Sequence, residues 1–82
     1  MIKIGEIIPI TMVPYAKKAR IVEIRGGHGF QRKMRVMGLR EGKILRVVTK
    51  QPLHGPLTIE TGGSQVTIGM GMAKRILVEV IE

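Results

Sequence analysis

Glycine and proline residues divide this chain into short segments, and this limits the folds open to it. Eleven glycines and four prolines are spread over 82 residues. The runs between them are rich in Ile, Val and Leu, as strands are. Strands this short and closely spaced leave no room for parallel crossovers, so we expect a mainly β protein whose antiparallel sheet curls into a small, partly closed barrel. A weak helical turn is expected at residues 69–75, and strands are expected at 19–25, 43–51, 57–61, 65–68 and 76–81.

One segment changes to helical periodicity. Phe30, Met34 and Met37 recur at positions i, i+4 and i+7, which places them on one face of a helix. Gly38 follows where a left-handed residue commonly ends a helix, and Leu39 is expected to fold back onto the last turn. The sequence therefore predicts a short helix from Phe30 to Met37 that turns its basic residues to solvent.

Most of the positive charge is concentrated around this helix. The formal net charge of the chain is +8. Residues 25–46 carry seven cations and one anion, whereas residues 1–24 have a net charge of +2 and residues 47–82 a net charge of 0. A basic surface suits an acidic partner such as phosphate, RNA, an anionic membrane or an acidic protein. Net charge of this size also keeps a small domain soluble, so charge alone does not establish a partner.

Several classes of chemistry are excluded by composition. The chain has no cysteine, which rules out disulfides, cysteine-based zinc sites and thiol nucleophiles. Tyr15 and Phe30 are its only aromatic residues, too few for a stacking platform that reads nucleic-acid bases. Ser64 is the only serine, and it lies in an expected hairpin turn with no His or Asp spaced around it. We therefore expect no catalytic site and no enzyme activity.

The two histidines are the candidate metal ligands. His28 and His54 lie in glycine-flanked segments, but they are far apart and have no carboxylate within a few residues. An iron site would need help from Glu60, Gln65 or a partner, and imidazole and carboxylate ligands do suit ferrous iron. A structural or solvent-facing role is the commoner one for such histidines. The glycine-rich stretch at 26–29 lacks the nucleotide-binding spacings and is predicted to be a strand-to-helix turn that needs positive φ.

A series of short motifs runs along the chain: Gly26-Gly27, Met37-Gly38-Leu39-x-x-Gly42, Leu45-x-Val47, Pro52, Gly55-Pro56-Leu57-x-Ile59, Val66-x-Ile68, Ala73 and Ile76-x-Val78. This pattern, over about residues 10–80, resembles the FeoA family of ferrous iron transport A proteins. Two positions depart from the family pattern: Ala16 stands where a glycine is usual before the first strand, and Gly69 stands where an arginine is frequent. We divide the chain into an N-terminal extension, residues 1–9, and a single domain, residues 10–82.

The resemblance implies an SH3-like barrel in the cytoplasm, or peripheral at the inner face of the membrane. It implies an accessory role beside a membrane ferrous iron permease that carries a GTP-binding domain. The contacted part of the permease, direct weak binding of ferrous iron and homo-oligomerisation all stay open. Charge and apolarity favour a partner-binding surface on the basic helix, formed by Phe30, Arg32, Lys33, Arg35, Leu39 and Arg40.

Two other functions remain open at this stage. Small basic SH3-like barrels can bind RNA through phosphate contacts, although the scarcity of aromatic residues argues against specific nucleic-acid recognition. The SH3-like domain of iron-dependent repressors resembles the same family, which leaves a metal-sensing module as the other alternative.

Overall fold

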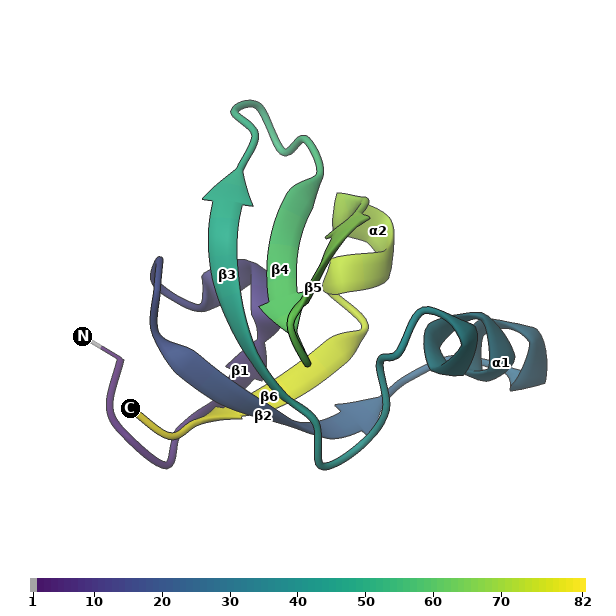
Figure 1. Ribbon diagram of the computed structural model, residues 1–82, viewed down its shortest axis with the longest axis horizontal. Coiled ribbons are helices and arrows are strands. Elements are labelled where there is room, and N and C mark those ends of the chain that lie inside the picture. The colour runs from purple at the N-terminus through teal and green to yellow at the C-terminus, as the bar shows by residue number, and fades with distance from the viewer. Residues whose placement is uncertain (1) are drawn as a thin grey trace.

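The computed structural model describes residues 2–82. These residues form one antiparallel sheet in the strand order β1-β6-β2-β3-β4-β5. In Figure 1, β3, β4 and β5 stand upright while β6 and β2 run across their lower ends, so the sheet curls back on itself. The elements are β1 (Ile7–Pro9), a 3-10 turn (Ile10–Met12), β2 (Lys18–Ile24), α1 (His28–Val36), β3 (Ile44–Lys50), β4 (Leu57–Thr61), β5 (Ser64–Ile68), α2 (Met70–Ala73) and β6 (Ile76–Val80).

The five strands expected from the sequence are all present, with ends that differ by at most one residue. The helix begins two residues before Phe30 and ends one residue before Met37. β1 was not predicted, because three residues ending in proline show no alternation of their own. It forms by pairing with β6, and its Ile8 is buried in the core. The division of the chain after residue 9 stays a prediction, but part of the first segment is an edge strand of the sheet.

Irregular pairing lets uneven apolar spacing fill one core. Ile21 and Ile24 are three residues apart, so a regular strand would turn one of them outward. The register of β2 against β6 shifts between Ile21 and Glu23, and both isoleucines are buried. A bulge of this kind re-aims side chains while keeping the strands paired.

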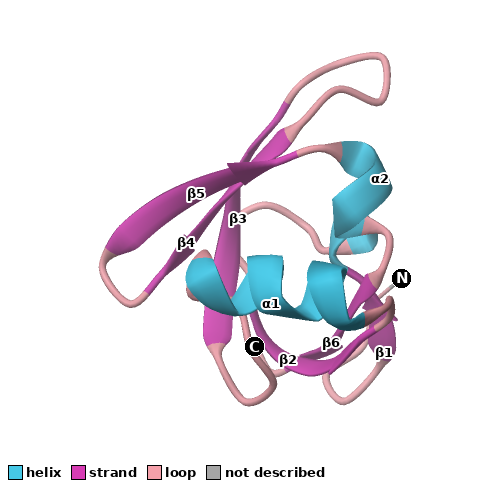
Figure 2. Ribbon diagram, turned by 90° about the vertical axis from the view of Figure 1, so that its right-hand side faces the viewer, coloured by secondary structure: helices cyan, strands magenta, loops and turns pink. Residues whose placement is uncertain are grey.

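α1 lies at the side of the sheet, beyond the end of β2 (Figures 1 and 2). Met34 is fully buried, and Phe30 and Met37 are half-buried against the core, which confirms the predicted inner face of the helix. Gly38 has φ +85° and donates its N–H to the carbonyl of Arg35, while Leu39 donates to the carbonyl of Met34. These two bonds form a Schellman motif, with Gly38 as the left-handed residue that the sequence predicted after the helix.

Candidate partner-binding surface

The cations of α1 face solvent. Arg32, Lys33 and Arg35 are exposed on the helix, and Arg40 is exposed in the loop that follows it. We call these four residues the basic helix surface. Within residues 2–82, none of the four forms an ion pair with a carboxylate. The predicted cationic face is therefore present, and its charge is not neutralised within the described chain.

The turn before α1 fixes how the helix is attached. Gly26 has φ +149°, and a Cβ atom built there would lie 2.7 Å from the Phe30 ring, so this position needs glycine for both its conformation and its contact. The side-chain amide of Gln31 donates a hydrogen bond to the carbonyl of Ile24 at the end of β2. The predicted strand-to-helix turn at 26–29 is thus confirmed, and its role is to seat α1 against the sheet.

The two apolar residues predicted to contact a partner, Leu39 and Phe30, are less accessible than expected. Leu39 is 0% exposed because the Schellman motif folds it onto the core, so its expected contact with a partner is wrong. Phe30 is half-buried, and the guanidinium carbon of Arg75 lies 5.1 Å from its ring centroid. Cation–π packing of this kind occupies part of the ring that a partner would otherwise meet.

Val36 is the apolar residue that sequence reasoning missed. It is 81% exposed at the last position of α1. Arg32 and Lys33 precede it by four and three residues, which are the spacings of neighbours on a helix surface. The signal was in the sequence, because Val36 is out of phase with Phe30 and Met34. An apolar side chain therefore lies among the cations of the basic helix surface.

Arg35 and Arg40 come together although they belong to different segments. Both line a small hollow of about 230 Å³, which also includes Ile24, Gln31 and Glu41. Glu41 is the one carboxylate of this hollow, yet neither arginine forms an ion pair with it within the described chain. The hollow extends the basic helix surface from the helix into the following loop.

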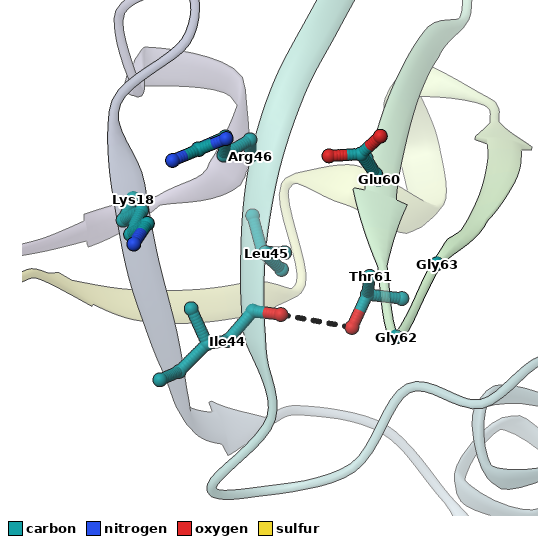
Figure 3. Close-up of a pocket in the computed structure, with 8 residues that line it drawn as sticks. All are labelled: Lys18, Ile44, Leu45, Arg46, Glu60, Thr61, Gly62 and Gly63. Atoms are coloured by element: carbon teal, nitrogen blue, oxygen red, sulfur yellow. Dashed lines mark hydrogen bonds between the residues drawn. The ribbon is translucent and has the colours of Figure 1, made fainter.

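A larger hollow lies on the outer face of the sheet (Figure 3). It has a volume of about 330 Å³ and is walled by Lys18 on β2, Arg46 on β3 and Glu60 on β4. Thr61 is buried at its edge and donates its hydroxyl to the carbonyl of Ile44. Of these residues, the sequence offered only Glu60 as a candidate ligand, because alternation along a strand does not reveal which outward side chains of neighbouring strands meet.

The two histidines that the sequence offers as metal ligands do not meet. His28 begins α1 and His54 lies in the loop between β3 and β4, and Figure 1 shows these segments at separate corners of the molecule. In the part of the chain that the structure describes, no three His, Asp or Glu side chains are grouped to hold a metal ion. Nor does any helix of residues 2–82 have the length and apolarity needed to cross a membrane.

Comparison with known proteins matches this geometry to one family. A family model described as the FeoA domain matches residues 8–80. A protein of Methanocaldococcus jannaschii that carries the name Fe(2+) transport protein A is 32% identical to this chain over 74 residues. The match covers 90% of this chain and 88% of the relative. A crystal structure of an iron uptake regulatory protein, FeoA, is 34% identical, with a TM-score of 0.83, and the match covers 90% of this chain and 97% of that one.

The same barrel also occurs inside larger proteins. A manganese-dependent transcriptional repressor has a TM-score of 0.84 at 15% identity, and the match covers 99% of this chain but only 45% of the repressor. Likeness at this identity shows the fold alone, since one fold hosts many functions. The predicted fold, a mainly β, SH3-like antiparallel barrel with a short basic helix, is confirmed.

Proposed function

This chain belongs to the FeoA family, and we propose that it is a non-catalytic accessory protein of ferrous iron uptake. In this proposal it contacts the cytoplasmic side of a membrane ferrous iron permease through the basic helix surface. The names of the relative and of the solved structure support the link to iron uptake. Ferrous iron is then the cargo of the partner.

The observation that carries the proposal is the absence of ion-pair partners for the four cations of the basic helix surface within residues 2–82. Exposed charges of one sign attract an oppositely charged surface over about a Debye length, roughly 8–10 Å at physiological salt. Such attraction speeds association and selects among partners more than it adds affinity. We therefore infer that the partner presents acidic residues to α1.

Val36 supplies the short-range part of the contact. Stable interfaces combine an apolar centre with a polar or charged rim. Burial of a valine side chain is worth roughly 1.5–3 kcal/mol, which is enough to shift an affinity at least tenfold. We propose that Val36 enters an apolar depression on the partner while Arg32 and Lys33 meet carboxylates at its rim.

The first test is an amide chemical-shift titration of the ¹⁵N-labelled protein with the nucleotide-loaded GTP-binding domain of the permease, near physiological salt. We expect the largest shifts at residues 28–40 and small shifts in β4 and β5. Shifts spread evenly over the sheet would contradict the proposed surface. Absence of shifts would exclude this domain as the partner and direct the search to the membrane part of the permease.

A matched pair of variants separates contact from charge. Val36→Asp and Leu53→Asp each replace an exposed apolar residue, 81% and 96% exposed, and each adds one negative charge. We expect Val36→Asp to weaken binding at least tenfold, because the lost burial of the side chain is worth roughly 1.5–3 kcal/mol. Leu53→Asp, in the loop between β3 and β4, should leave binding unchanged. Equal losses in the two variants would show that only net charge matters.

RNA is the alternative partner that the same surface would accept. Binding to phosphates falls steeply as salt rises, with a slope set by the number of contacts made. A filter-binding assay with a single-stranded RNA at two salt concentrations measures this slope. Tight binding with a steep slope, combined with no response to the permease domain, would favour the nucleic-acid function over the accessory one.

A further inference from the structure

We propose that Lys18 and Arg46 form a second binding site, which takes a carboxylate group in the hollow on the outer face of β2, β3 and β4. Figure 3 shows the three side chains that carry the argument, Lys18, Arg46 and Glu60. The site lies on the sheet and not on α1, so it does not rest on the function proposed above.

Strand register places two cations side by side. Lys18 on β2 is directly opposite Arg46 on β3, and Arg46 is directly opposite Glu60 on β4. Like charges at directly opposed positions of a sheet destabilise it. A sequence that keeps Lys18 and Arg46 in register therefore carries an electrostatic cost, which an anion between them would remove.

Arg46 has unused hydrogen-bonding capacity. Its Nε atom is shielded from solvent and has no hydrogen-bond partner within residues 2–82. Neither Arg46 nor Glu60 forms an ion pair within that part of the chain, although they face each other in register. In Figure 3 the guanidinium extends toward the strand that carries Lys18 and away from the Glu60 carboxylate. Buried donors are almost always satisfied, so this atom points to a missing acceptor.

Two neighbouring cations on this face, unlike Arg46, form ion pairs within the protein. Arg20 on β2 forms an ion pair with Glu79 at 3.3 Å. Lys18 reaches only Glu82, at 3.9 Å, through an exposed and long contact. Lys18 therefore keeps most of its capacity to bind a second anion. Arg46 has no carboxylate partner within the described chain, so its charge is available to an added anion.

The hollow favours a singly charged carboxylate over other anions. The planar guanidinium fork matches the two oxygens of a carboxylate, and Lys18 adds a point charge. Glu60 on the opposite wall repels a doubly charged anion such as phosphate more strongly than a carboxylate. Ile44, 47% exposed, lines the same hollow and offers apolar contact to a short side chain. Both a free carboxylate and the carboxyl end of a peptide meet these requirements.

The test follows the Nε–Hε signal of Arg46 by NMR during titration with three probes at constant ionic strength. The probes are acetate, N-acetyl-Gly-Leu with a free carboxyl group, and the same dipeptide as its amide. We expect saturable shifts with both acids, in roughly the millimolar range given one guanidinium–carboxylate contact near the surface, and none with the amide. Tighter binding of the peptide acid than of acetate would identify a peptide carboxyl end as the ligand, and equal binding would identify a free small carboxylate.

Variants make the assignment to these residues falsifiable. Arg46→Met and Lys18→Met should each weaken the acid response about tenfold or more, because each removes a charge-assisted bond. Arg46→Lys keeps the charge but loses the fork, and it should retain only part of the affinity. Glu60→Gln should tighten binding by removing the repelling charge.

Arg20→Lys is the matched control, because Arg20 lies on the same face but already has Glu79, and we expect it to bind like the wild type. The absence of a saturable shift at Arg46 with either acid, in a protein whose spectrum shows it folded, would overturn the proposal. A response that survives Arg46→Met unchanged would overturn it as well.

Discussion

β2 and α1 are both basic, but their cations are used in different ways. The cations on β2 and just beyond it each have a carboxylate partner, in the pairs Lys18–Glu82, Arg20–Glu79 and Arg25–Glu23. Within residues 2–82, the cations of the basic helix surface have none. The comparison teaches that an ion pair within the fold reduces the charge a cation offers to another molecule, strongly for Arg20 at 3.3 Å and only weakly for Lys18 at 3.9 Å.

The two segments also differ in how they are held. β2 lies inside the sheet, hydrogen-bonded to β3 on one side and β6 on the other. α1 projects from the side and depends on one fully buried side chain, Met34, together with the turns at its two ends. A segment held at few points is the one expected to adjust when a partner binds.

The largest expected effect concerns that single anchor. Met34→Ala should lower the free energy of unfolding by about 3 kcal/mol, because it removes a buried side chain and leaves a cavity. Urea denaturation measures the loss. Met12→Ala is the matched control, since Met12 is 55% exposed, and it should change stability by less than about 0.5 kcal/mol. Equal effects of the two changes would mean that α1 is not anchored through Met34.

An effect of intermediate size on stability is expected at two left-handed residues, one before β2 and one after α1. Ala16, before β2, has φ +66°, and Gly38, after α1, has φ +85°. The left-handed region costs a residue with a Cβ atom about 1–2 kcal/mol. Ala16→Gly should therefore stabilise the protein by about 1 kcal/mol, and Gly38→Ala should destabilise it by a similar amount. Thermal unfolding of both variants checks the opposite signs; a change of the same sign in both would contradict the explanation.

The smallest expected change in stability comes from removing single cations. Arg20→Gln removes a partly exposed ion pair and should cost about 0.5 kcal/mol of stability. Arg32→Gln removes an unpaired surface charge and should change stability by less than about 0.3 kcal/mol. Chemical denaturation at low salt compares the two. A cost for Arg32→Gln as large as that for Arg20→Gln would mean that α1 holds an ion pair in solution.

The sequence predicted the strands well because their alternation and their glycine turns are local signals. It placed Gly38 and Leu39 correctly at the helix end but wrongly assigned Leu39 to the partner surface, since a residue that folds back onto the core is lost to a partner. Val36 escaped prediction because the helix was identified from the residues in phase with its core face. β1 and the Lys18–Arg46 neighbourhood depend on pairing between distant segments, which no local pattern specifies.

The central claim is that the unpaired cations of α1 recognise an acidic surface on the permease. Its most direct test is the affinity for the nucleotide-loaded GTP-binding domain, measured for Arg32→Glu with Lys33→Glu and for Lys3→Glu with Lys17→Glu. All four positions are exposed, and each double change lowers the net charge from +8 by 4, to +4. We predict that the first pair weakens binding at least about tenfold while the second changes it by less than about twofold, because attraction between close charges is local. Equal weakening by both pairs would contradict the claim, since net charge rather than the basic helix surface would then control binding.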